Sequence, residues 1–82
     1  MKTNERIALI GIVVKDSEQV KHVNDLLHEY RQFIIGRMGI PHRKHDLCII
    51  SVAIETKQDD IATLSGKLGA LKGISAKVLY AS

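Results

Sequence analysis

Two almost unbroken apolar runs constrain the fold of this 82-residue chain more than any other feature. The first, RIALIGIVVK, spans residues 6–15, and the second, LCIISVAIE, spans residues 47–55. Both are rich in β-branched residues and apolar at odd and even positions, which is typical of strands buried on two faces. Gly11 interrupts the first run and indicates a point where another backbone approaches closely. We therefore expect two central strands of one sheet.

Two amphipathic helices are predicted beside these strands. Apolar residues at three- and four-residue steps mark a helix over residues 17–31. Asp16 and Gln19 resemble a capping box at its start. The same spacing over residues 61–71 marks a second helix, and Gly73, which follows Lys72, predicts its end.

Two further strands complete the pattern. Residues 33–40 read FIIGRMGI, and Pro41, which cannot donate to a sheet ladder, indicates either an edge strand or the end of this strand. The polar connection at residues 42–46 is short enough for a hairpin with the next strand. Residues 74–80 alternate between apolar and polar side chains and form the last strand.

The resulting order of strand, helix, strand, strand, helix, strand is the ferredoxin-like or split βαβ motif. We predict a single α+β domain over residues 1–82, a sandwich of a four-stranded antiparallel sheet in the order 4-1-3-2 and two helices on one face. This order places the two most apolar strands in the centre. The strands with the proline, the charges and the glycines then lie at the edges.

The sheet face opposite the helices is bare in a monomer of this fold. A sheet with one face in water normally alternates between apolar and polar residues, but here neither parity of the central strands is polar. The single Cys48 cannot form an internal disulfide, and so short a chain gains stability from association. We expect a homo-oligomer, a dimer or a tetramer, joined through the open sheet face. A cover formed by the end of the chain is the alternative, with only Ala81 and Ser82 available.

Composition excludes several classes of protein. The chain carries 12 Lys and Arg against 9 Asp and Glu, a net charge of +3, with three aromatic residues. This mild excess and the lack of an aromatic platform do not indicate direct nucleic-acid binding. No apolar run approaches the roughly 18 residues of a membrane span. The first residues lack the pattern of a signal peptide, so we expect a cytoplasmic protein without a membrane partner.

His42, His45 and Cys48 form the spacing H-x-x-H-x-x-C. Two imidazoles and a thiolate can bind zinc, nickel or copper, and a site assembled across subunits is the version to look for. The simpler interpretation, which we favour, is two solvated hairpin histidines and a small buried cysteine.

The basic stretch of the hairpin is likewise more typical of a solvated surface than of a phosphate contact. It comprises Arg37, His42, Arg43, Lys44 and His45.

Glycines flank a basic residue in the segment Gly36-Arg37-Met38-Gly39. Arg37 offers a planar fork for a carboxylate or phosphate, which indicates an anionic ligand or partner at the sheet edge. The alternative is that the glycines serve sheet curvature at a subunit contact and that Arg37 forms an interfacial salt bridge. Gly66 and Gly69, inside the second helix, predict close packing against another element or another subunit.

Five segments resemble the family of regulators of the iron-only hydrogenase system. They are RIALIGIVV at the start, V-x-x-V-N-D-L-L-H-E-Y at residues 20–30, I-I-G-R-M-G-I-P at 34–41, I-I-S-V at 49–52 and L-S-G-K-L-G-x-L-x-G at 64–73. The resemblance implies a ferredoxin-like fold akin to ACT domains and to the C-terminal domain of the nickel-responsive repressor. ACT-type modules bind ligands between subunits, near the loop after the first strand. In this chain that loop is Lys15-Asp16-Ser17. Together with the glycine-flanked segment, it gives the predicted ligand-site residues Gly11, Asp16, Gly36, Arg37 and Gly39.

The function predicted from sequence is a stand-alone regulatory or sensing domain that binds a small ligand or a partner regulatory protein at subunit interfaces. A metal-responsive module using His42, His45 and Cys48 is the first alternative. A small enzyme on a ferredoxin-like dimer is the second, and it lacks support because neither a Ser-His-Asp order nor a paired carboxylate in a cleft can be argued from the sequence. We therefore do not expect an enzyme, and the sequence names no cofactor.

Overall fold

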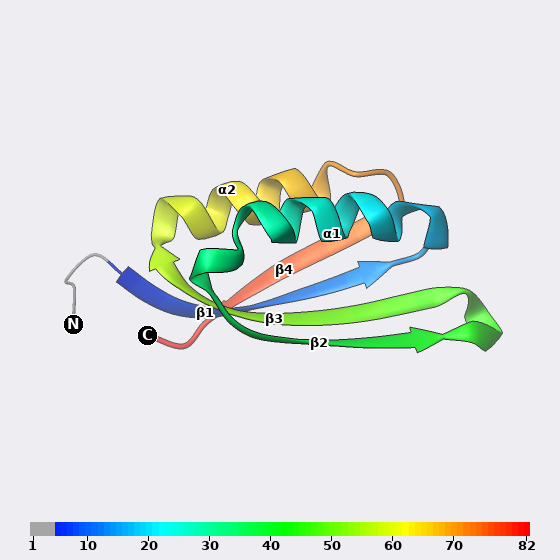
Figure 1. Ribbon diagram of the computed structural model, residues 1–82, viewed down its shortest axis with the longest axis horizontal. Coiled ribbons are helices and arrows are strands. Elements are labelled where there is room, and N and C mark those ends of the chain that lie inside the picture. Colours follow the sequence, from blue (N-terminus) through cyan, green and yellow to red (C-terminus); the bar gives the residue numbers. More distant parts are fainter. Residues whose placement is uncertain (1–4) are drawn as a thin grey trace.

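The structure, a computed structural model, describes residues 5–82 and has two layers (Figure 1). The sheet has the strand order β2-β3-β1-β4, every neighbouring pair is antiparallel, and both helices lie on one face of it. The predicted ferredoxin-like α+β fold is confirmed, since this is the order 4-1-3-2 taken from the other edge. The elements are β1 (Glu5–Val14), α1 (Val20–Glu29), β2 (Ile34–His42), β3 (Leu47–Lys57), α2 (Gln58–Gly69) and β4 (Ile74–Tyr80).

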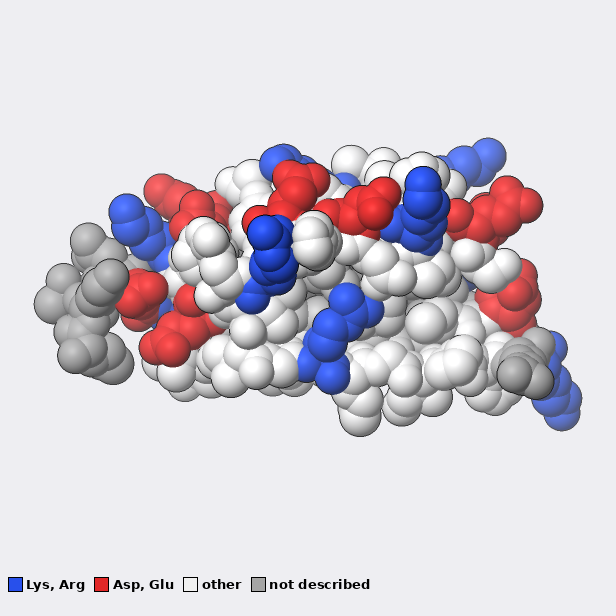
Figure 2. All heavy atoms as spheres, in the orientation of Figure 1, with Lys and Arg blue, Asp and Glu red and all other residues white. Residues whose placement is uncertain are grey.

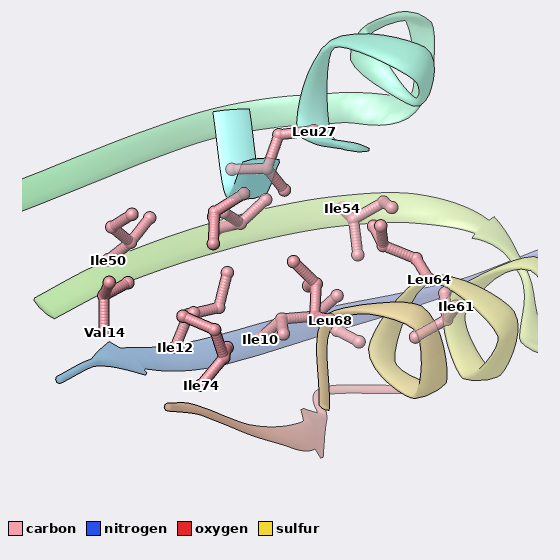
Figure 3. Close-up of a cluster of buried hydrophobic side chains, with 13 residues drawn as sticks. Ile10, Ile12, Val14, Leu27, Ile50, Ile54, Ile61, Leu64, Leu68 and Ile74 are labelled. Carbon is pink, nitrogen blue, oxygen red and sulfur yellow. The ribbon is translucent and has the colours of Figure 1, made fainter. Parts of the chain in front are cut away.

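The core lies between the sheet and the two helices, and it is almost entirely aliphatic (Figure 3). β1 and β3 pair with Ile10 opposite Val52 and Ile12 opposite Ile50, so that these side chains share the helical side of the sheet. Helix α2 contributes a stripe at steps of three and four residues. Its fully buried members are Ile61, Leu64 and Leu68, and α1 adds Val23 and Leu27.

The entry into α1 differs from the prediction in one respect. A turn of 3-10 helix covers Ser17–Gln19, and the α-helix proper begins at Val20. Asp16 caps this turn, because its Oδ1 accepts a hydrogen bond from the backbone N–H of Glu18 at 3.0 Å. Gln19 does not return the bond that a capping box requires; its Oε1 lies 3.0 Å from Nδ1 of His22.

Helix α2 ends earlier than predicted. It finishes at Gly69 with Ala70 as its C-cap, and Gly73 belongs instead to the turn before β4. Gly73 has a φ of 76°, in the left-handed region, and its carbonyl accepts a hydrogen bond from the N–H of Lys15 at 2.9 Å. Gly73 therefore fixes the contact between the end of β1 and the start of β4, not the end of the helix.

The close approaches predicted at Gly11, Gly66 and Gly69 do not occur within the chain. A Cβ built at any of these three positions meets nothing within 4 Å. The prediction was wrong for contacts inside one chain. A glycine in the sequence is compatible with a close contact, but it does not show whether the contact is made within the chain or with another molecule. Among residues 5–82, no helix is long and apolar enough to cross a membrane. Residues 1–4, which the search for a signal peptide included, lie outside the described residues.

Candidate functional site

The first candidate surface is the open sheet face, and Figure 1 shows no described helix or strand beneath it. Residues directly opposite one another in an antiparallel pair share a face, so the register assigns this surface in rows across the sheet. The three central rows, each running from β2 to β4, are Gly36-Ala53-Leu9-Leu79, Met38-Ser51-Gly11-Lys77 and Ile40-Ile49-Val13-Ser75. Lys77 is the charged member of these rows.

Large apolar side chains on this face are in contact with water. Leu79 is 69% exposed and Met38 59%, and substantial fractions of Leu9, Ile40 and Ile49 are also exposed. Near the centre of this face the side chains are small or absent, so the surface lies close to the backbone there. The residues concerned are Gly11, Gly36, Ser51 and Ala53. Monomeric proteins rarely expose an apolar patch larger than a few hundred Å². The surface is thus an exposed, largely apolar sheet face.

A second feature is the cleft between α1 and β2, which we call the α1–β2 cleft. Its volume is about 330 Å³. Arg37 lies opposite Val52 in the sheet register, which places it on the helical side of the edge strand. From there its Nη2 donates a hydrogen bond to Oδ1 of Asn24 on α1, at 2.8 Å. The lining residues are Asn24, Leu27, His28, Arg31, Ile34 and Arg37.

Arg31 reaches the same cleft from the 3-10 turn that follows α1. Its Nη1 donates to the backbone carbonyl of His28 at 2.9 Å. Figure 2 shows Lys and Arg side chains in the middle of this face, near the boundary between the helical layer and the sheet, and both basic and acidic side chains along the upper edge and towards the ends. The α1–β2 cleft is therefore a basic recess, and an anion is the ligand that its chemistry suits.

The hairpin between β2 and β3 holds a third feature, a cleft of about 220 Å³. His42, Asp46 and Cys48 are among its lining residues, and Ser17 and Val20 close it from the start of α1. The ring of His42 stacks on that of His45, with centroids 5.0 Å apart. Cys48 is half-buried against the core. Asp46 turns the hairpin with a φ of 52°, a conformation that Asp tolerates better than most residues.

The proposed metal ligands are only partly brought together. His42 and Cys48 border one cleft, and His45 lies beside His42. Within the described part of the chain, however, no group of three His, Cys, Asp or Glu side chains is arranged to hold a metal ion. The side chain of Arg43, assigned from sequence to the basic hairpin, lies outside the described residues.

The five residues predicted from sequence as a ligand site are dispersed over the molecule. Gly11 and Gly36 lie on the open face, whereas Arg37 and Gly39 pair with residues of the helical side. The side chain of Asp16 caps a turn at the far end of β1. They do not form one pocket in a single chain, so a site that uses all of them would need more than one copy.

Sequence reasoning missed the helical half of the α1–β2 cleft. Asn24, His28 and Arg31 recur at steps of four and three residues, the spacing that places side chains on one side of a helix. This spacing can be seen in the sequence, but the apolar residues of the same helix show a clearer periodic pattern, and the polar one was not considered. Only Arg37, the partner on the strand, was singled out.

The comparisons with known proteins agree with this architecture. Residues 6–78 match the family model "TM1266-like: Iron-only hydrogenase system regulator, putative". Among solved structures, the uncharacterized protein TM1266 from Thermotoga maritima is 37% identical, with a TM-score of 0.90, and the match covers 95% of this chain and 99% of that one. The C-terminal domain of the MgtC protein from Mycobacterium tuberculosis has a TM-score of 0.74 at 8% identity, over 98% of this chain and 92% of that one, a likeness of fold alone.

Among curated proteins, a "Putative nickel-responsive regulator" of Saccharolobus islandicus is 27% identical over 66 residues. The match covers 80% of this chain and 49% of the relative, so the chain spans about half the length of the curated relatives it matches. The family model, by contrast, covers most of the chain. The chain belongs to the family of TM1266-like iron-only hydrogenase system regulators.

Proposed function

We propose that this chain is a cytoplasmic, self-associating regulatory module that acts by binding, not by catalysis. Two copies stack through their open sheet faces, and a small ligand or a partner regulatory protein is recognised where copies meet. The observation that carries the proposal is the exposed apolar face, with Leu9 and Leu79 on one of its central rows and Ile49 on another. Covering these side chains would remove apolar area from water, which is the main driving force of protein association.

The size of the face supports this arrangement. β1 is ten residues long and the sheet is four strands wide. At about 3.3 Å per residue and about 4.8 Å per strand, the face has a projected area on the order of 600 Å². Stable interfaces bury about 800 Å² of accessible surface on each partner, and accessible area exceeds projected area. One sheet face is therefore enough for a dimer.

The glycines fit the same proposal. Gly11 and Gly36 have no neighbour within 4 Å of a Cβ in the single chain, and both lie on the open face. A second sheet that stacks on the face would come closest at these low positions. In this proposal Gly11 and Gly36 serve the contact between copies, whereas Gly39 pairs with Ile50 on the helical side of the sheet. Arg37 lies on that helical side and Asp16 at the end of β1, so in this proposal they supply polar groups of ligand sites beside the stacked face and not within it.

The mass of the particle in solution tests self-association. We expect size-exclusion chromatography with light scattering to give a multiple of 9.1 kDa at micromolar concentration. Leu9→Lys and Ile49→Lys put a charge into the stacked face and should give monomers. Ala62→Lys, on the exposed side of α2, adds the same charge away from the face and should leave the mass unchanged. A monomeric wild-type chain, or a loss of association in Ala62→Lys equal to that in the face variants, would refute the proposal.

A metal-responsive module is the second candidate. It has support in the similarity to the Saccharolobus proteins named as nickel-responsive regulators and in the cleft that His42 and Cys48 share. The described residues of one chain do not place three donors around a metal ion, so the site would need a further ligand from a second copy. Native mass spectrometry after incubation with nickel tests this directly. An integral number of ions per oligomer, lost in His42→Ala, supports the candidate, and a bare oligomer at saturating nickel excludes it.

A further inference from the structure

The α1–β2 cleft brings two guanidinium groups together without an acidic partner. Arg37 and Arg31 each donate to a neutral oxygen, the amide Oδ1 of Asn24 and the carbonyl of His28 respectively. None of the six residues that line the cleft is Asp or Glu. The positive charge of both arginines is therefore not neutralised by a residue that lines the cleft.

We propose that this cleft binds a small molecule through an oxyanion, a phosphate or a carboxylate, held between Arg31 and Arg37. Guanidinium groups bind both oxyanions through paired, charge-assisted hydrogen bonds. His28 adds a further polar ring on the same wall. Asn24 is a positioning residue, because its bond to Nη2 orients the guanidinium of Arg37 and leaves the other nitrogens available to the ligand.

The size and the walls of the cleft limit what it can hold. Its volume of about 330 Å³ lies at the lower end of the range of about 300 to 1,000 Å³ for small-molecule sites. Leu27, almost completely buried, and the half-buried Ile34 form apolar parts of the wall. A compact anion with a short apolar portion fits these surroundings.

The distribution of charged residues on α1 also favours an anionic ligand in the cleft. Lys21 lies seven residues before His28, so it extends the basic side of the helix towards its N-terminus. The acidic residues of the helix, Asp25 and Glu29, are exposed and do not line the cleft. The helix thus presents basic and amide groups towards β2.

This inference is independent of self-association. Arg37 lies on the helical side of β2, opposite Val52, whereas the apolar rows occupy the other face of the sheet. A second copy stacked on the open face leaves the α1–β2 cleft accessible. The cleft can therefore bind its ligand in a monomer or in a stacked dimer.

Titration of the ¹⁵N-labelled chain, followed by NMR, tests the proposal with two probes. Inorganic phosphate and succinate are added separately in a buffer without other oxyanions. We expect one of them to cause saturable shift changes at Asn24, His28, Arg31 and Arg37, and the probe that saturates first identifies the source of the oxyanion. Absence of saturation by either probe in the millimolar range, or shifts that map elsewhere, would overturn the proposal.

Three variants and one control sharpen the test. Arg37→Gln and Arg31→Gln should each weaken binding by about tenfold or more, the usual effect of losing a hydrogen bond to a charged group. Asn24→Asp places a carboxylate against Arg37 and should abolish binding while the fold is retained. Lys72→Gln removes the same unit of charge outside the cleft and should change affinity by less than about twofold. If Lys72→Gln weakens binding as much as Arg37→Gln, the attraction is only that of net charge, and the proposed site is wrong.

Discussion

Arg37 of β2 and Asn24 of α1, thirteen residues apart in the chain, are joined by a hydrogen bond of 2.8 Å from Nη2 to Oδ1. The bond links an edge strand to the helix above it, across the α1–β2 cleft. Because both side chains are exposed, we expect a coupling energy of only about 0.5 to 1 kcal/mol. A double-mutant cycle with Asn24→Ala and Arg37→Ala, measured by urea unfolding, gives this value. A coupling near zero would show that Asn24 does not orient Arg37 in solution.

The course of the chain was predictable because each element is marked by several independent local features. The two apolar runs correspond to β1 and β3, and Pro41 falls on the edge strand as expected. The ends of the helices were less predictable. Gly73 is a typical helix stop, but it is required by the turn that joins Lys15 to the start of β4, a contact between segments far apart in the sequence.

The candidate site was only half predictable for a related reason. Arg37 stands out because glycines flank its segment, whereas Asn24 and Arg31 lie in a helix among other polar residues. What brings them together is the register of β2 against β3 and the position of α1 above the edge strand. Neither relation is encoded in local spacing. The same holds for Gly11, whose open surroundings are visible only once both faces of the sheet are known.

Gly73 should be the glycine least tolerant of substitution. Its φ of 76° costs an L-residue about 1 to 2 kcal/mol, and a Cβ there meets the Cβ of Asp16 at 3.4 Å. We expect Gly73→Ala to lower the free energy of unfolding by about that amount, which is measurable by urea denaturation. Gly73→Asn should cost less, because Asn adopts the left-handed region more readily. An Ala variant as stable as the wild type would show that this turn relaxes in solution.

Two substitutions of Asp16 distinguish its role in capping the turn from a role of its charge. Its Oδ1 accepts from the N–H of Glu18, so Asp16→Ala should cost about 1 kcal/mol through the lost cap. Asp16→Asn keeps an acceptor oxygen and should retain most of that stability. Thermal unfolding of the two variants provides the comparison. Equal destabilisation by Ala and Asn would show that the charge of Asp16, and not the capping bond, is what matters.

A substitution of Gly66 can test whether α2 contacts a second copy of the chain. It lies inside α2, and a Cβ there meets nothing within 4 Å. In an isolated chain, Gly66→Ala should therefore raise the free energy of unfolding by about 0.8 to 1 kcal/mol, the difference in helix propensity. This corresponds to a rise in Tm of roughly 4 to 8 °C for a domain of this size.

The measurement is best made on a monomeric background such as Leu9→Lys and repeated on the wild-type chain. If copies associate only through the sheet face, Gly66→Ala should stabilise both forms equally, because α2 lies on the opposite side of the sheet. If the substitution stabilises the monomer but weakens association of the wild-type chain, a second copy packs closely against α2. Association would then use the helical layer as well as the sheet, and the arrangement proposed above would have to be replaced by one with two kinds of interface.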